Sequence, residues 1–122
     1  MRIYKYTMAA MLDANLRAEL EELTASVCRA LNDPKRLLIL YALAAEPRSV
    51  SDLGDLLEVS QSNVSQHLAV LRDRGLVEPA RDANRIIYSL RDRRVVEAIA
   101  LLRDVMNDEL ARRQALRGSA SG

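Results

Sequence analysis

The sequence predicts a mostly helical α+β fold, in which two short helices precede a two-stranded β-hairpin and a long helix lies at each end of the chain. Two observations predict it. Residues 50–57 and 60–75 place apolar side chains at helical spacing on either side of a tight turn. Residues 76–80 and 86–90 are β-branched or apolar runs that flank a polar segment. With 122 residues, of which 49% are hydrophobic, the chain has the length of one domain, residues 1–122.

The first predicted element is a helix over residues 8–31. Its apolar residues recur every three or four positions and form one stripe over about six turns. The stripe consists of Met8, Leu12, Leu16, Leu20, Leu23, Val27 and Leu31. Ile3, Tyr4 and Tyr6, ahead of this helix, are apolar enough to pack against the same surface.

The next two helices carry recognisable start signals. Asp33 fits an N-cap and Pro34 fits the first helical position, so a helix is expected to begin there. Ser49 and Asp52 fit a capping box ahead of the first short helix, with Asp in place of the usual Glu. A three-residue turn then leads to the second short helix, and this spacing is typical of a helix-turn-helix motif.

The helix over residues 60–75 has a surface that an ordinary solvated helix lacks. Ser60 is a good N-cap and Gly75 a good left-handed stop, so both ends are defined. One apolar stripe consists of Val64, Leu68 and Leu71. The other faces carry uncharged hydrogen-bonding side chains, namely Gln61, Ser62, Asn63, Ser65, Gln66 and His67. Such groups match base edges in the major groove and reach phosphates, so the pattern predicts a helix that reads DNA.

Individual roles follow from side-chain chemistry. Asn63 and Gln66 are the preferred base readers, because an amide can bridge N6 and N7 of adenine. Ser62 and Ser65 are expected to hold phosphates.

Three further side chains are candidates for contacts with the DNA backbone. His67 meets a DNA phosphate or braces the helix, or else is a hydrogen-bonded histidine without a functional role. Arg72 is expected at the DNA backbone. Arg36, just inside the helix that Asp33 caps, either touches the backbone of DNA or pairs with a carboxylate within the fold.

The hairpin is predicted with a five-residue tip, residues 81–85. Five arginines against two aspartates lie between residues 81 and 94, although the net charge of the chain is only +1. A basic tip beside a helix that reads DNA is placed to reach a phosphate or the minor groove. Residues 34–90 are therefore predicted to form a winged helix-turn-helix core, with Arg81, Asn84 and Arg85 at the tip of the wing.

A second long helix is predicted over residues 92–116, followed by a disordered tail at 117–122. A core of about sixty residues has too little surface to cover both terminal helices, so we expect them to meet a second copy of the chain in an isologous dimer. The alternative is that they fold back on their own subunit. The expected interface residues are Leu12, Leu16, Leu20, Leu23, Val27, Val95, Ile99, Leu102, Met106 and Leu110.

Three segments together resemble the ArsR/SmtB family of bacterial repressors. They are residues 31–40, which begin Leu31-Asn-Asp-Pro-Lys-Arg36, residues 60–68, and residues 71–77. Their order and spacing agree with the family, and the resemblance covers residues 31–90. It implies a homodimeric winged-helix repressor that binds an inverted repeat in double-stranded DNA and is released by an effector, often a metal ion.

The metal ligands that the resemblance implies are missing. Where family members carry a Cys-x-Cys pair, this chain has Ser49 and Ser51, and hydroxyls are poor ligands for soft metals. The last helix offers Asp104, Asp108 and Glu109 without a nearby histidine. The chain has one Cys and one His, so we expect no metal site and no cofactor.

The sequence does not determine which signal would release the protein from DNA, and Cys28 is one candidate sensor. It either packs as a small hydrophobe beside Val27, or is a thiol switch that senses oxidants or sulfur species. The other candidates are a small organic ligand or partner between the terminal helices, and no effector at all.

Other classes of protein fit less well. No nucleophile–base pair or Gly-rich phosphate loop is present, so an enzyme is not expected. A winged-helix protein-interaction module is the alternative from another class, but the chain has four Tyr and no Phe or Trp, whereas protein hot spots favour aromatic residues. The sequence shows no signal peptide and no membrane span, and its single cysteine fits a cytoplasmic protein.

Overall fold

The computed structural model describes residues 13–121. The predictions for Met8 and Leu12, and for Ile3, Tyr4 and Tyr6, lie outside the described residues. The elements in chain order are α2 (Ala14–Leu23), η1 (Thr24–Cys28), α3 (Arg29–Leu31), α4 (Pro34–Ala45), β1 (Arg48–Ser49), α5 (Val50–Leu57), α6 (Gln61–Asp73), β2 (Val77–Asp82), β3 (Arg85–Leu90) and α7 (Arg94–Ser121).

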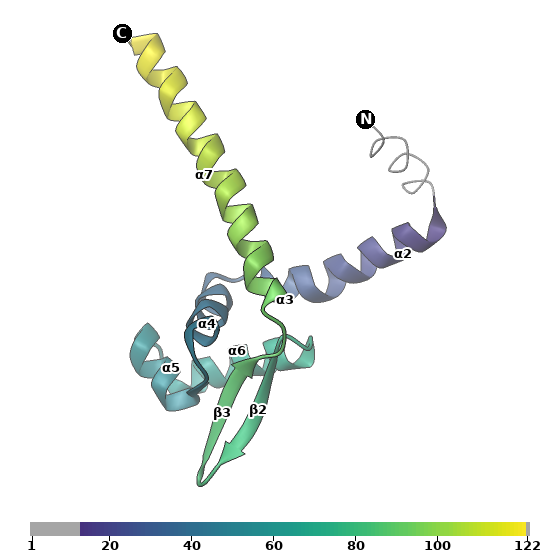
Figure 1. The fold of residues 1–122 in the computed structure, drawn as a ribbon, viewed down its shortest axis with the longest axis vertical. Helices are drawn as coiled ribbons and strands as arrows, with labels where there is room; N and C mark the ends of the chain where they lie inside the picture. The colour runs from purple at the N-terminus through teal and green to yellow at the C-terminus, as the bar shows by residue number, and fades with distance from the viewer. Residues whose placement is uncertain (1–12, 122) are drawn as a thin grey trace.

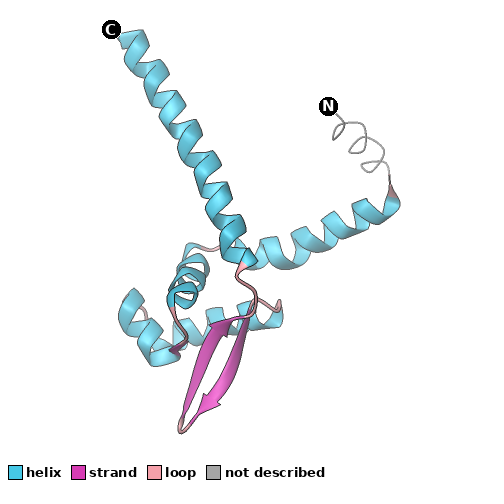
Figure 2. Cartoon of the chain, viewed as in Figure 1, coloured by secondary structure: helices cyan, strands magenta, loops and turns pink. Residues whose placement is uncertain are grey.

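The elements form a small core with two long arms. Helices α4, α5 and α6 pack together beside a three-stranded antiparallel sheet of order β1-β3-β2. Helices α2 and α7 project from this core in different directions, and the β2–β3 hairpin extends from it on the side away from α7 (Figure 1). Colouring by secondary structure shows that helix dominates and that the hairpin carries nearly all of the strand (Figure 2).

The hydrophobic core is built mainly by α4, α5 and α6. The stripe of α6 is buried as expected, and α4 and α5 meet it from the other side. Each fully buried aliphatic side chain contributes about 1.5–3 kcal/mol relative to an exposed one. The buried apolar residues are Ala30, Ile39, Leu40, Leu43, Leu53, Val64, Leu68, Leu71, Val77 and Ile99.

The helix starts are confirmed in detail. Asp33 accepts hydrogen bonds from the backbone N–H groups of Lys35 and Arg36. Ser49 and Asp52 form the predicted capping box, and Ser60 accepts from the backbone of Asn63 at 3.1 Å. These side chains satisfy N–H groups that have no partner within their own helix, so local sequence alone determines where α4, α5 and α6 begin.

The N-terminal arm is not the single α-helix predicted over residues 8–31. Helix α2 ends at Leu23, five residues form the π-helix η1, and α3 is a single turn. The hydroxyl of Thr24 donates to the carbonyl of Leu20 at 2.8 Å. A side chain that bonds back into the preceding turn competes with the backbone ladder, which accounts for the change of helix type at this residue.

The hairpin also differs from the prediction. Strand β2 continues to Asp82 and β3 begins at Arg85, so a two-residue turn replaces the predicted five-residue tip, and Arg81 lies on a strand. Ala83 adopts φ of 56°, which residues with a Cβ rarely do. The usual sequence signal for this turn is Asn-Gly or Asp-Gly, and it is absent here. Strand β1 was not predicted, because a two-residue strand has no detectable pattern.

Helix α7 is longer than predicted. It reaches Ser121, so residues 117–121 are helical rather than the predicted disordered tail. Glu109 pairs with Arg112 at 2.7 Å and with Arg113 at 3.1 Å, and such i,i+3 and i,i+4 pairs favour helix on an exposed segment. Among the described residues, no helix is long and apolar enough to cross a membrane.

Candidate DNA-binding surface

The outer face of α6 carries the predicted polar side chains. Gln61, Ser62, Ser65 and Gln66 are exposed, while the opposite face of the helix is buried in the core. The surface therefore presents amide and hydroxyl groups from a helix whose position is fixed by packing, the arrangement that base readout requires.

The turn between α5 and α6 depends on a glycine. Glu58 adopts a left-handed conformation with φ of 57°, and the N–H of Val59 donates to the carbonyl of Gly54 at 3.0 Å. A Cβ on Gly54 would lie 2.9 Å from the backbone oxygen of Val59. Only glycine therefore allows the turn to approach α5 this closely, which sets the position of α6 relative to α5.

Asn63 does not have the environment predicted for a base reader. Its side chain is half-buried, and its Oδ1 is a buried atom without a hydrogen-bond partner among the described residues. Reading adenine through an amide needs both the oxygen and the nitrogen at the groove. In this arrangement Asn63 does not present that pair, whereas the exposed Gln66 does.

The Arg36 side chain bonds to groups within the fold. Its Nε donates to the carbonyl of Ala30 at 2.6 Å and its Nη2 to the carbonyl of Arg29 at 3.3 Å. Its Nη1 lies 3.4 Å from Nδ1 of His67. The expected alternative of an ion pair with a carboxylate is wrong, because the acceptors are backbone carbonyls and an imidazole.

Asp33 lies close to this group. Partial burial raises the pKa of Asp33, but the N–H groups of Lys35 and Arg36 outweigh it, with further lowering by His67 and the Arg36 guanidinium. The pKa of Asp33 is therefore below its ordinary value, and the carboxylate is the form that caps α4.

Arg85 is bound to the start of α5. Its Nη2 donates to Ser49 Oγ at 3.0 Å and to Asp52 Oδ2 at 2.9 Å. The backbone and hydroxyl of Ser49 lower the pKa of Asp52, and Arg85 adds to this effect. Arg85 thus links the wing to the helix-turn-helix, and its contact with DNA stays a prediction.

The remaining predicted contacts are open to solvent. Arg72 at the end of α6, Arg81 on β2 and Asn84 in the hairpin turn are exposed. The structure brings Arg81 and Asn84 together on the wing, and Arg72 lies apart from them at the last turn of α6.

Two sets of contacts at this surface were not predicted from the sequence. They are the bonds of Arg85 to Ser49 and Asp52, and the bonds of Arg36 to the carbonyls of Arg29 and Ala30. The capping box could be recognised in the sequence, but its bonds with Arg85 could not. Arg85 lies 36 positions after Ser49 and 33 positions after Asp52.

About half of the residues predicted at the dimer interface are exposed on the surface of the two arms. Leu20, Leu23, Leu102, Met106 and Leu110 are exposed. Two exceptions on the N-terminal arm, Leu16 and Val27, are half-buried. Two others lie on α7, where Ile99 is only 6% exposed and Val95 packs against the core. These two α7 residues were predicted at the interface, but they anchor the first turns of α7 to the subunit.

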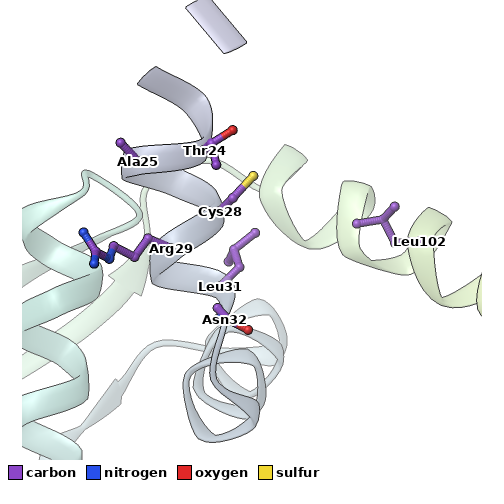
Figure 3. Close-up of a pocket in the computed structure, with 7 residues that line it drawn as sticks. All are labelled: Thr24, Ala25, Cys28, Arg29, Leu31, Asn32 and Leu102. Carbon is purple, nitrogen blue, oxygen red and sulfur yellow. The ribbon is translucent and has the colours of Figure 1, made fainter. Parts of the chain in front are cut away.

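A cavity of about 640 Å³ lies between the N-terminal arm and α7. Figure 3 shows Cys28 and Leu31 on the side of the arm that faces Leu102 of α7, while Arg29 points the other way. Cys28 is exposed, so the expectation that it packs as a buried hydrophobe does not hold within one chain. In the described part of the chain, no group of three or more His, Cys, Asp or Glu residues is placed to hold a metal ion.

A helix-turn-helix with a β-hairpin beside its second helix defines the class of winged helix-turn-helix DNA-binding domains. Residues 33–79 match the family described as "Bacterial regulatory protein, arsR family". The chain is 43% identical over 93 residues to the HTH-type transcriptional regulator YgaV of Escherichia coli, across 75% of this chain and 93% of that relative. It is 40% identical over 91 residues to the HTH-type transcriptional regulator NmtR of Mycobacterium tuberculosis, across 75% of this chain and 72% of the relative. The chain belongs to the ArsR family, which consists of DNA-binding transcriptional regulators and not of enzymes.

Solved structures agree with the fold. The crystal structure of Rv0081 from M. tuberculosis superposes with a TM-score of 0.70 at 37% identity, across 77% of this chain and 95% of that one. The solution structure of a homodimeric winged helix-turn-helix domain from Mycobacterium bovis gives a TM-score of 0.70 at 29% identity, across 81% and 92%.

Proposed function

We propose that this chain is a homodimeric transcriptional repressor that binds an inverted-repeat operator through α6 and the wing, and that its release does not depend on a transition metal. The observation that carries the proposal is the outer face of α6, where neutral amide and hydroxyl side chains are exposed on a helix that is capped at its start and packed on its inner face.

The two-fold arrangement is supported by the exposed apolar faces of both arms and by the homodimeric domain from M. bovis. A two-fold protein places two copies of α6 about 34 Å apart, or a multiple of that, on successive major grooves. An inverted repeat with this spacing is the matching operator.

The direction of control is part of the proposal. Relatives include a probable mercury resistance operon repressor of Streptomyces lividans and the transcriptional activator HlyU of Vibrio cholerae. We favour repression, since a dimer bound to an inverted repeat within a promoter would occupy DNA that polymerase needs.

Operator binding is tested on Gln66. Gln66→Ala removes an exposed amide and should cost on the order of 1–3 kcal/mol on the operator while relaxing specificity at one base pair. Fluorescence anisotropy on operator and scrambled duplexes measures both effects. Asn63→Ala, the matched amide on the same helix, should change specificity less, because its Oδ1 is buried. Equal affinity of the wild type for operator and scrambled DNA would exclude sequence-specific binding.

Metal independence is supported by the engagement of Ser49, whose Oγ caps α5 and accepts a bond from Arg85. Zinc, cadmium, arsenite or copper, added to the protein–operator complex under reducing conditions, should change the affinity by less than about 0.5 kcal/mol. A ligand shifts an equilibrium only by its differential affinity for the two states. A stoichiometric metal that dissociates the complex would contradict this.

A further inference from the structure

The Arg36 side chain joins three segments of the chain. It leaves α4, bonds the carbonyls of Ala30 and Arg29 at the end of the N-terminal arm, and reaches Nδ1 of His67 on α6 at 3.4 Å. Arg36 and His67 are both half-buried, and Ala30 is fully buried. The guanidinium is therefore fixed on one side by two carbonyls when it meets the imidazole on the other.

The chemistry of this contact determines where the imidazole carries its proton. A guanidinium has five N–H donors and no acceptor, so in a hydrogen bond with Arg36 the Nδ1 of His67 must accept. An accepting Nδ1 has no proton, and the neutral ring then carries its single proton on Nε2.

The Nε2 position is available for a further bond. No hydrogen bond in the described residues uses it, and the buried side-chain atom without a partner there is Asn63 Oδ1, not a nitrogen of His67. The ring thus has one nitrogen engaged by Arg36, while the other has no hydrogen bond to a described residue and is not a buried atom without a partner.

We propose that Arg36 is a positioning residue for DNA recognition, which holds His67 in the Nε2–H tautomer so that α6 presents a neutral N–H donor to a DNA phosphate. The proposal rests on the DNA-binding function proposed above. An N–H donor to an anionic phosphate oxygen forms a charge-assisted hydrogen bond. The other tautomer would direct a lone pair at the same oxygen. Arginine is required, because its planar fork reaches two carbonyls and the ring together, whereas the point charge of lysine does not.

The tautomer can be measured without DNA. The chain has one histidine, so its imidazole signals need no assignment by mutation. Long-range ¹H–¹⁵N correlation at about pH 8, above the ordinary pKa range of histidine, should show an unprotonated, hydrogen-bonded Nδ1 and a protonated Nε2. Arg36→Met should move the spectrum toward mixed tautomers. Arg29→Met is the matched control and should leave it unchanged, because Arg29 contributes only its carbonyl. A protonated Nδ1 in the wild type would overturn the proposal.

Operator affinity gives the second measurement. Arg36→Met should weaken binding about tenfold in the wild type but less than about threefold in a His67→Gln background, because the Gln amide donates without any choice of tautomer. Equal losses in both backgrounds would show that Arg36 is only a structural tie and would overturn the proposal. If the wild type bound no operator, the proposed function would fail, while the imidazole spectrum would still decide the tautomer.

Discussion

Asp33 links the stability of the fold to pH, because its carboxylate caps α4. Asp33→Ala removes the cap of α4 and should lower the free energy of unfolding by about 1 kcal/mol at neutral pH. Asp33→Asn keeps a capping oxygen, so it should lose less. Urea denaturation of the three proteins measures both differences.

The pH dependence of this effect has a definite sign. Because the pKa of Asp33 is lower in the folded protein, its ionic contribution is fully present above the ordinary value of 3.8 and is lost as the pH falls through the folded value. The difference between wild type and Asp33→Asn should therefore shrink as the pH falls below about 4. A difference that grew in acid would contradict the assignment.

At the residue scale, the sequence predicted contacts between neighbours and missed contacts between distant residues. Asp33, Ser49 and Ser60 cap their helices as expected, because a cap and its N–H partner are two or three residues apart. Arg85 was predicted at DNA, and Arg36 either at DNA or paired with a carboxylate within the fold. In the structure both bond groups that lie far from them in the sequence or that the fold brings close, and the sequence did not predict these bonds. The sequence pattern of a basic residue near a DNA-reading helix is the same whether its side chain contacts DNA or bonds to another part of the fold.

At the element scale, the link from Arg85 to α5 determines how the wing is held. Arg85→Met should leave the fold intact, since β3 still pairs with both β1 and β2. It should increase hydrogen exchange at the hairpin turn, because the wing loses its bonds to Ser49 and Asp52. Exchange mass spectrometry measures this.

The matched variant is Arg81→Met, on the facing strand. Arg81 is exposed, so its removal should reduce the slope of log affinity against log salt by about 1, as for a phosphate contact. Arg85→Met should leave that slope nearly unchanged. If Arg85→Met reduced the slope as much as Arg81→Met, Arg85 would leave Asp52 to contact DNA, and the link would not persist in the complex.

The elements themselves were predicted where burial imposes a period. Helices α5 and α6 appear as expected because each has one buried stripe and a cap. The π-helix η1 and the turn at Ala83 were missed, because one depends on a single hydroxyl that bonds back and the other on an alanine in a conformation that alanine rarely adopts. Periodicity carries no information about either.

At the scale of the whole molecule, the exposed apolar faces of α2 and α7 are the surfaces proposed to join two copies of the chain. Helix α7 projects from the core (Figure 1). Ile99 is buried near its start, whereas Leu102, Val105, Met106 and Leu110 further along are exposed. The sequence predicted the stripes of both arms but not where the subunit core stops and the exposed stripe begins. That boundary depends on how far α4 reaches along α7, which no local pattern encodes.

The dimer is tested by two adjacent leucines of α7. Leu102 and Leu101 are each 67% exposed in the single chain, but only Leu102 lies on the predicted stripe and lines the cavity against the N-terminal arm. Leu102→Asp would place a charge without a partner in the two-fold interface, at a cost of several kcal/mol, and should give a monomer. Leu101→Asp adds the same charge about 100° around the helix and should remain a dimer. Light scattering at micromolar concentration measures both masses. A monomeric wild type, or two variants that dissociate equally, would show that this stripe is not the interface.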